Sequence, residues 1–428
     1  MCGIAGVFTR DGSTPDREVV LAMTRALAHR GPDEEGAHAE SGVGLGNRRL
    51  VVLAPEAGGQ PMSDPRQQVW ISFNGEVYNH DDLRSELTAG GYVFRGRSDT
   101  EVALASYMAW GESAFSRFEG MFSVALWDGR SHVGILARDR MGQKPLYYAA
   151  LGSGDLVFAS ELRALRCHPA FVPAVSDAGL AYYLTYEYLP GDLSILSGVQ
   201  KLRPGHFLRF ERGEQRTQLY WDIPFRSLDM ELGEAASQLD SRLNDAVARR
   251  LRADVPVGVL LSGGIDSSTI AALAVANHKG EPLHSFCIGF DDPSFDESEA
   301  AAVVASHLGL RHHTRHFSDA DALGALSEVG AALDEPLGDA SLLATYALSR
   351  LARETVVVAL GGDGADELLM GYPTFRADPV ARAYARMPQW FRRTIARQVA
   401  RVPVDSRNFS PEFVVKSFLD GAGTSCDR

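Results

Sequence analysis

The sequence is poor in cysteine and in basic residues. Its four cysteines, Cys2, Cys167, Cys287 and Cys426, include no Cys-x-x-Cys pair and no spacing typical of a zinc site or a disulfide framework. The formal net charge of −13 argues against a general nucleic-acid or anionic-membrane surface, because such surfaces need clustered Lys and Arg. We therefore expect a reducing compartment, and neither nucleic acid nor membrane as a partner.

Long apolar runs and targeting signals are also missing. No apolar run reaches about 18 residues, and the first residues lack the charged start and apolar core of a signal peptide. Of the 428 residues, 45% are hydrophobic and 23% charged, which indicates a soluble globular protein of two or three domains. These features predict a cytoplasmic protein.

Residues 256–269 predict a strand, a turn and a helix in succession. An apolar run ends at Leu261, the turn and helix start read SGGIDSS over 262–268, and an Ala-rich apolar run follows. The glycines let the backbone approach an anion, and the hydroxyls and first helical N–H groups point at it. A Gly-rich turn with N-capping serines is the alternative. The candidate nucleotide-binding residues here are Leu261, Ser262, Gly263, Gly264, Asp266, Ser267 and Ser268.

Asp266 predicts a metal. A carboxylate beside a phosphate site is repelled unless a cation lies between them, so we interpret Asp266 as a Mg²⁺ ligand. Residues 356–372 repeat the pattern of buried strand, Gly-rich turn and acidic residues, and Asp366 can supply a second carboxylate. Two such strand ends define a nucleotide site at the carboxyl edge of a parallel sheet.

The start of the chain holds a candidate nucleophile. With a small residue in second position, removal of Met1 would give Cys2 both a thiol and a free α-amino group. An α-amino group titrates at about 7.7–8.0 and a thiol at about 8.5, so the amine can act as base for its own nucleophile. Taken alone, Cys2 is as typical of a buried strand.

Several motifs further along give Cys2 a context. The chain reads HRGPD at 29–33, GNRRL at 46–50, GGQPM at 58–62, FNGEVYN at 73–79 and RSDTE at 97–101. This set closely resembles the glutamine-hydrolysing domain of class II amidotransferases, which have an N-terminal-nucleophile fold. With GMFSVALWD at 120–128, ARDRMGQKPLYY at 137–148 and FASE at 158–161, it resembles the asparagine synthetase family over nearly the whole chain.

Glutamine chemistry gives these positions their roles. Arg49 can pair the α-carboxylate of glutamine, since a guanidinium fork suits two oxygens. Asp99 and Glu76 can hold the ammonium group. Attack by the Cys2 thiolate creates an oxyanion that the Asn74 amide and the Gly75 N–H would stabilise, each such contact being worth about 3–4 kcal/mol. The family resemblance implies the same roles.

Simpler interpretations accompany these. Asn74 and Gly75 could form a type I′ hairpin turn between strands at 69–73 and 77–78, which is compatible with an oxyanion hole. Arg49 and Asp99 could be surface charges. We assign Arg30 and Asp33 to the scaffold.

The resemblance implies an α+β N-terminal-nucleophile hydrolase domain, an αββα sandwich, at residues 2–211. A doubly wound parallel-sheet α/β domain of ATP-pyrophosphatase type follows at 232–428, and we expect it to be incomplete at its C-terminus. Its cofactors would be ATP and Mg²⁺, and a homodimer is expected. By resemblance Ile288 contacts adenine, Gly361 and Gly362 line the phosphates, and Asp363, which we count as catalytic, contacts the acyl-adenylate.

Two departures concern the acceptor and the chain end. Asparagine synthetases recognise aspartate with a threonine-rich segment, whereas residues 333–341 read LDEPLGDAS, as in relatives that amidate other carboxylates. Relatives also continue through helices carrying a catalytic lysine, and Lys416 lies too close behind the acidic loop to replace it.

The prediction is glutamine-dependent synthesis of an amide. Glutamine hydrolysis at Cys2 supplies ammonia, which attacks an acyl-adenylate made from Mg-ATP and a carboxylate, aspartate by default. Three alternatives stay open: the same chemistry on a sugar-acid or peptide carboxylate, a β-lactam synthetase, and a truncated chain with glutaminase or binding activity only. The intact Cys2, Arg49, Asn74 and Asp99 weigh against the second.

Overall fold

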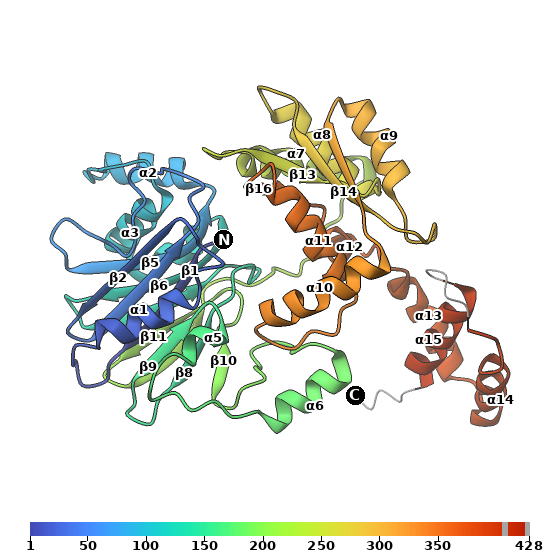
Figure 1. The fold of residues 1–428 in the computed structure, drawn as a ribbon, viewed down its shortest axis with the longest axis horizontal. Coiled ribbons are helices and arrows are strands. Elements are labelled where there is room, and N and C mark those ends of the chain that lie inside the picture. Colours follow the sequence, from blue (N-terminus) through green and yellow to red (C-terminus); the bar gives the residue numbers. More distant parts are fainter. Residues whose placement is uncertain (405–409, 424–428) are drawn as a thin grey trace. The chain divides into compact units, whose positions relative to one another are not determined.

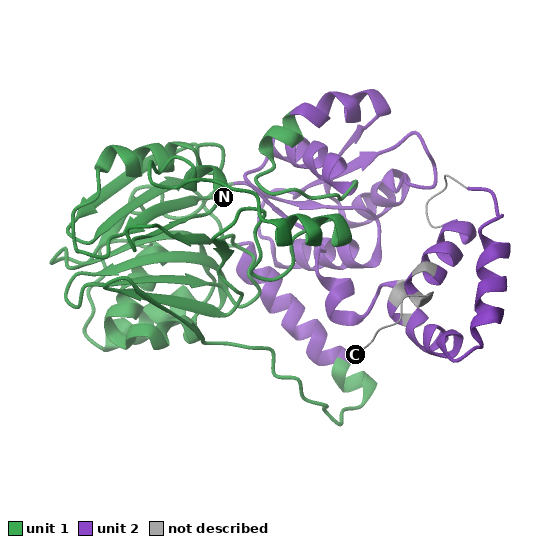
Figure 2. Ribbon diagram, turned by 90° about the horizontal axis from the view of Figure 1, so that it is seen from below, with its two compact units in different colours: residues 1–235, 252–255, 328–340 green, residues 236–251, 256–327, 341–428 purple. Residues whose placement is uncertain are grey.

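The computed structural model describes residues 1–404 and 410–423. The chain divides into two compact units, shown in Figure 2. Unit 1 comprises residues 1–235, 252–255 and 328–340, and unit 2 comprises residues 236–251, 256–327 and 341–428. Within the described part of the chain, no helix is both long enough and apolar enough to cross a membrane.

Unit 1 contains two six-stranded sheets (Figure 1). In the first, the order β10-β8-β9-β1-β3-β2 places the strand that follows Cys2 between two antiparallel neighbours. Its strands are β1 (Gly3–Phe8), β2 (Glu34–Glu40), β3 (Val43–Arg49), β8 (Tyr147–Ala150), β9 (Leu156–Ala159) and β10 (Val199–Lys201).

The second sheet has the order β12-β11-β7-β6-β5-β4. Its two longest strands pair antiparallel over their whole length, with Asn74 opposite Ser123 and Gly75 opposite Phe122. Its strands are β4 (Met62–Ser63), β5 (Val69–Val77), β6 (Gly120–Asp128), β7 (Val133–Arg138), β11 (His206–Glu211) and β12 (Glu214–Leu219).

The two sheets pack face to face around aromatic side chains. Phe8 of β1 lies 4.9 Å from Phe158 of β9 between ring centroids, and 5.9 Å from Phe210 of β11. Helices cover the outer faces: α1 and α5 pack with the first sheet, and α2 and α3 with the second. The result is the αββα sandwich that the sequence predicts. The helices are α1 (Arg17–Arg25), α2 (His80–Ala89), α3 (Asp99–Trp110), η1 (Gly111–Ser113), α4 (Ala114–Arg117), α5 (Leu162–Leu165) and α6 (Asp177–Tyr186).

Unit 2 is built on a four-stranded parallel sheet of order β15-β14-β13-β16. Apolar side chains of α7, α8 and α9 pack against one face, around Val259, and those of α11 against the other, around Phe286. Helices on both faces of a parallel sheet make the doubly wound α/β fold that the sequence predicts. The strands are β13 (Val257–Leu260), β14 (His284–Gly289), β15 (Arg311–His316) and β16 (Val358–Leu360).

The helices of unit 2 follow the predicted spacing. The 232–251 segment is helical almost throughout, and the helix after the Ser-Gly-Gly turn begins at Ile265. Two helices have residues in both units, α7 (Leu232–Arg250) and α10 (Asp319–Ala332). The others lie within unit 2 and are α8 (Ile265–Asn277), α9 (Ser298–Leu308), α11 (Ser341–Arg353), α12 (Ala365–Leu369), α13 (Pro373–Ala385), α14 (Gln389–Val399) and α15 (Pro411–Gly423).

Candidate functional site

The Cys2 thiol lies at the entrance to β1 and is half-buried. Its sulfur accepts a hydrogen bond from the Leu50 N–H at 3.4 Å and donates to the Leu50 carbonyl at 3.7 Å. Burial raises the pKa of the Cys2 thiol, and the Leu50 backbone, the chain's amino terminus and Arg49 lower it. The thiol is therefore mainly protonated at neutral pH and needs a base before it can attack.

The two predicted oxyanion residues lie within a strand. β5 continues through Asn74 and Gly75 in register with β6, so the interpretation of this pair as a hairpin turn is wrong. A Cβ added to Gly75 would stand 2.0 Å from the Met121 carbonyl oxygen, so only glycine fits this close strand pairing.

The side-chain amide of Asn74 does not use all of its hydrogen-bonding groups within the protein. Its side chain is 1% exposed, its Nδ2 donates weakly to Ser123 Oγ at 3.4 Å, and its Oδ1 is buried without a protein partner among the described residues. A buried amide whose hydrogen-bonding groups are not all used is costly unless a ligand completes the bonding. This is the behaviour expected of a residue that serves a substrate.

Arg49 ends β3 and is held in a fixed pose. Nη1 lies 2.9 Å from Glu34 Oε2, and Nη2 donates to the carbonyls of Leu53 and Ala54, each at 2.9 Å. Only 5% of the residue is exposed, which excludes the interpretation of Arg49 as a surface charge. The Glu34 carboxylate shows that this guanidinium accepts a carboxylate partner; its role towards glutamine stays a prediction.

Asp99 begins α3, whose N-cap is Ser98, and it is also buried rather than a surface charge. Its Oδ2 accepts from the Val77 N–H at 3.1 Å, close behind Asn74 and Gly75 on the same strand. Burial raises the pKa of the Asp99 carboxyl, so a cation such as an ammonium group would stabilise its charged form. Glu76 is half-buried on β5.

Lys144 lies in the motif at 137–148, where nothing in the sequence assigned it a role of its own. It is 6% exposed, and burial, followed by the charge of Arg30, lowers the pKa of its ammonium group. Glu76 and Cys2 act on the same pKa in the opposite direction. A buried cation electrostatically coupled to the nucleophile and to Glu76 is part of the charge balance of this site.

Arg30, which the sequence assigns to the scaffold, contacts the backbone of the candidate nucleophile. Its Nε donates to the carbonyl oxygen of Cys2 at 3.0 Å. Asp33 accepts from the Val51 N–H at 2.8 Å, a contact between the segments that precede β2 and follow β3. The adjoining glycine at 31 was the available signal: a Cβ there would stand 2.3 Å from the Arg48 carbonyl carbon, so the segment is packed tightly.

In unit 2, the loop after β13 has the geometry of an anion site. Ser262 and Ser267 share a hydroxyl hydrogen bond of 2.9 Å, and the Gly264 N–H donates to Ser262 Oγ at 3.3 Å. Gly263 has a φ of +84°, which favours glycine, and Gly264 caps α8 without a side-chain bond. The buried Oγ of Ser268 has no protein partner among the described residues. The N–H groups of a helix N-terminus, together with a hydroxyl that has no protein partner here, suit phosphate.

The acidic loop after β16 lies against this one, because β13 and β16 are neighbouring parallel strands. A Cβ on Gly362 would stand 2.9 Å from the Ser267 nitrogen and 3.0 Å from the Asp266 carbonyl carbon. Asp266 and Asp366 are both half-buried. Mg²⁺ is usually bound by one or two carboxylates and substrate phosphates, so this donor set fits it. No cluster of three or more metal-ligating side chains occurs in residues 1–404 and 410–423.

The remaining predicted nucleotide residues divide between core and surface. The side chain of Leu261 is 2% exposed and that of Ile288 is 8% exposed, and both belong to the sheet core. A nucleotide contact from Leu261 would therefore come from its backbone. Asp363 is exposed, and Gly361 leaves room for the Asp363 carboxylate, which lies 2.8 Å from where a Cβ would stand.

Lys416 of α15 is engaged locally. Its Nζ lies 2.5 Å from Glu412 Oε1 and donates to the Val402 carbonyl at 2.9 Å.

The two sites define a class, a glutamine amidotransferase domain joined to a synthetase domain, and comparisons with known proteins place the chain in it. Residues 1–221 match the family model of the glutamine amidotransferase domain, and residues 238–420 match that of asparagine synthase. The chain belongs to the glutamine-hydrolysing asparagine synthetase family.

Individual relatives agree with this assignment. The chain is 35% identical over 414 residues to asparagine synthetase [glutamine-hydrolyzing] 1 of Bacillus subtilis (strain 168), covering 96% of this chain and 65% of that protein. It is 32% identical over 397 residues to putative asparagine synthetase [glutamine-hydrolyzing] 2 of Methanocaldococcus jannaschii, covering 87% of this chain and 76% of that protein. The chain thus spans about two thirds of the length of the first relative.

Among solved structures, the glutamine phosphoribosylpyrophosphate amidotransferase of B. subtilis, complexed with ADP and GMP, aligns with a TM-score of 0.39 at 15% identity. The alignment covers 84% of this chain and 81% of that one.

Proposed function

We propose that this protein synthesises an amide with glutamine as the nitrogen donor, consuming Mg-ATP. The observation that carries the proposal is the pair of sites in one chain: in unit 1 a half-buried Cys2 thiol and an Asn74 amide with an unused oxygen, and in unit 2 two Gly-rich loops with Asp266 and Asp366 at adjacent parallel strand ends. Residues 2–211 would form the glutaminase domain and residues 232–428 the synthetase domain.

In the glutaminase half, Arg49 binds the α-carboxylate of glutamine, and Asp99 with Glu76 binds its ammonium group. The Cys2 thiolate attacks the side-chain amide carbon, and its proton passes to the α-amino group that removal of Met1 exposes. Asn74 and the Gly75 N–H stabilise the oxyanion. Ammonia leaves, and water then hydrolyses the thioester to glutamate.

In the synthetase half, an acceptor carboxylate oxygen attacks the α-phosphorus of ATP and pyrophosphate leaves. The 262–268 loop binds the phosphates through backbone N–H groups and hydroxyls. Asp266 and Asp366 would hold Mg²⁺, which neutralises phosphate charge. Asp363 and the backbone at 361–362 contact the adenylate, and Ile288 contacts adenine. Ammonia then attacks the acyl carbon, AMP leaves, and the amide forms.

Aspartate is the proposed acceptor, because both curated relatives are named asparagine synthetases. The sequence of residues 333–341 favours a second candidate, the same chemistry on a sugar-acid or peptide carboxylate. A homodimer and a cytoplasmic location stay predictions.

The test of the two-site proposal is Cys2→Ala. This variant should lose glutamine-dependent amide synthesis and glutamate production but keep amide synthesis from ammonium chloride, because the thiol serves only the glutaminase half. Glutamate and amide are measured by amino-acid analysis. Cys167→Ala, which alters an exposed thiol, is the control and should change neither activity. Loss of both activities in Cys2→Ala would contradict two separate sites.

A further inference from the structure

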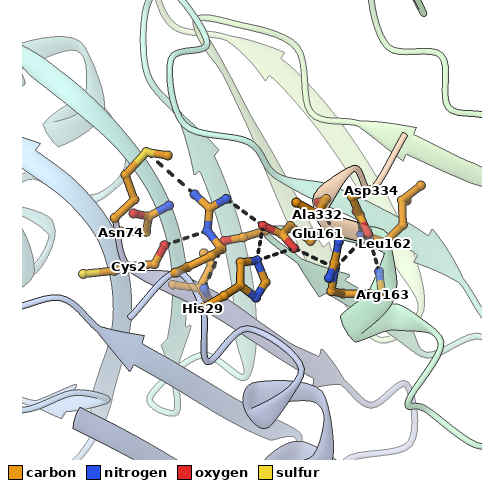
Figure 3. Close-up of polar contacts among 12 residues, drawn as sticks. Cys2, His29, Asn74, Glu161, Leu162, Arg163, Ala332 and Asp334 are labelled. Carbon is orange, nitrogen blue, oxygen red and sulfur yellow. Dashed lines mark hydrogen bonds and ion pairs between the residues drawn. The ribbon is translucent and has the colours of Figure 1, made fainter. Parts of the chain in front are cut away.

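Four charged side chains inside unit 1, those of Arg30, Glu161, Arg163 and Asp334, form a row that begins at the backbone of Cys2 (Figure 3). Arg30 donates from Nε to the Cys2 carbonyl oxygen at 3.0 Å, and its Nη1 lies 2.9 Å from Glu161 Oε1. The side chains of Arg30 and Glu161 are only 9% and 11% exposed. Water cannot readily replace either partner, so each charge depends on the other for its position.

Glu161 has two further neighbours, a histidine and a second arginine. His29 Nε2 and Arg163 Nε each lie 3.0 Å from Glu161 Oε2. The carboxylate is therefore shared between the arginine that contacts Cys2 and an arginine on the opposite side. Its position depends on both.

Arg163 is held in turn by residues 331–334. Its backbone N–H donates to Asp334 Oδ1 at 2.9 Å, its Nε lies 3.4 Å from the same oxygen, and its Nη2 donates to the carbonyls of Ala331 and Ala332 at 3.2 and 2.7 Å. The Leu162 N–H donates to the other oxygen of Asp334. Asp334 thus caps α5, which has no side-chain cap of its own.

Asp334 belongs to a stretch that is distant from the glutaminase domain in the sequence but belongs to the same compact unit in the fold. Residues 328–340 fall inside the region that matches the asparagine synthase model, yet they are part of unit 1 (Figure 2). A second anchor is Glu335, whose carboxylate lies 2.6 Å from Lys201 Nζ and accepts from the Tyr147 hydroxyl and the Ile195 N–H, each at 3.1 Å. These three partners of Glu335 are not among Arg30, Glu161, Arg163 and Asp334.

We propose that Asp334 is a positioning residue for glutamine hydrolysis, acting on Cys2 through Arg163, Glu161 and Arg30. When the charge of Asp334 is removed, Arg163 pairs more strongly with Glu161 and draws it away from Arg30. Arg30 then holds the Cys2 carbonyl less firmly, and the nucleophile is placed less well. The stretch 328–340 therefore contributes to the placement of the nucleophile through Asp334. The inference rests on the proposed role of Cys2.

A double-mutant cycle on the full chain tests this. The variants are Asp334→Asn, Glu161→Gln, both together, and Glu335→Gln as a matched control on the same stretch. Asp334→Asn should lower kcat for glutamine hydrolysis by about fivefold or more, within the range of coupling between sites, with a smaller change in KM. Glu335→Gln should change kcat by less than about twofold, because its partners Lys201, Tyr147 and Ile195 are not shared with Asp334 or Glu161 and substitutions without shared partners are not coupled. In the Glu161→Gln background, Asp334→Asn should add nothing, because the row is already broken.

Equal effects of Asp334→Asn and Glu335→Gln, or an undiminished effect of Asp334→Asn in the Glu161→Gln background, would overturn the proposal in favour of simple anchoring. A second readout does not need turnover: the rate at which iodoacetamide alkylates Cys2, followed by peptide mapping. Asp334→Asn should change this rate and Glu335→Gln should not. If the wild-type chain fails to hydrolyse glutamine, the proposed function is wrong, while the alkylation rates still decide the inference. Thermal unfolding checks that each variant is folded.

Discussion

At the scale of single residues, the structure explains why some site residues are predictable and others are not. Cys2, Arg49, Asn74 and Asp99 could be proposed from the sequence because each lies in a local motif that resembles the family's and because their chemistry would suit the groups of glutamine. The contact of Arg30 with the Cys2 carbonyl could not be predicted, since it joins residues 28 positions apart in the sequence. Burial, which turns a generic arginine or lysine into a constrained charge, does not show in the sequence.

Asn74 gives a prediction at this scale. Asn74→Ala should lower kcat for glutamine hydrolysis by about 10²–10³-fold, the usual cost of one lost oxyanion donor. Ammonia-dependent amide synthesis should be retained. Stability should change little, because within the described residues the Asn74 side chain makes only a weak hydrogen bond, 3.4 Å long, to Ser123 Oγ. Ser123→Ala removes that partner alone and should leave kcat nearly unchanged. A similar loss in both variants would assign Asn74 a packing role.

At the scale of elements, patterns within one segment predicted well and pairings between segments did not. The strand, turn and helix at 256–269 follow from local sequence, and β13 and α8 lie where expected. The hairpin at Asn74-Gly75 was wrong because β5 pairs over its full length with β6, some 50 residues on, and this long-range pairing outweighs the local turn preference. The membership of residues 328–340 in unit 1 likewise depends on tertiary contacts.

The contact between the two loops of unit 2 can be tested at Gly362. A methyl group there would press on the backbone of Asp266 and Ser267, so Gly362→Ala should displace the phosphate loop. ATP-dependent pyrophosphate release should fall at least tenfold, about 1.4 kcal/mol, while glutamine hydrolysis continues. Gly324→Ala in α10 is the control, because nothing lies within 4 Å of its Cβ position. Unchanged pyrophosphate release would contradict the proposed role of this loop.

The histidines of β14 and β15 predict that the stability of the unit 2 sheet depends on pH. His284 Nδ1 lies 2.8 Å from His313 Nε2, and Ser285 Oγ lies 2.9 Å from His312 Nδ1. Burial, with the charge of His313, lowers the pKa of both His284 and His312 below the ordinary value of about 6.5. Below about pH 6.5 these two histidines therefore bind protons more readily in the unfolded chain than in the folded sheet. The free energy of unfolding should be highest above about pH 6.5 and should decrease as the pH falls below that value.

Urea unfolding between pH 5 and 8 measures this effect. The unfolding midpoint should decline below about pH 6.5 in the wild type, and the decline should be shallower in His284→Gln. His307→Gln, at an exposed position in α9, should keep the wild-type slope. Identical slopes in all three proteins would show that the β14–β15 histidines do not control the acid sensitivity.

At the scale of the whole molecule, one chain carries two compact units, each with its own core and its own candidate site. Sequence motifs identified both folds, since each motif set is tied to one strand and turn arrangement. The identity of the carboxylate that is amidated could not be predicted from such a motif. Residues 334 and 335 of the segment that departs from the aspartate-specific pattern have their carboxylates engaged with unit 1, so the departure alone does not define an acceptor.

The most direct test of the account is pyrophosphate release from Mg-ATP with glutamine present, as aspartate is added or withheld. The account predicts aspartate-dependent release matched by asparagine and glutamate in equal amounts. Release that depends on a sugar acid or a peptide carboxylate would keep the chemistry and change the acceptor. Glutamate formation with no pyrophosphate release for any of these acceptors would contradict the central claim that the chain couples glutamine hydrolysis to amide synthesis.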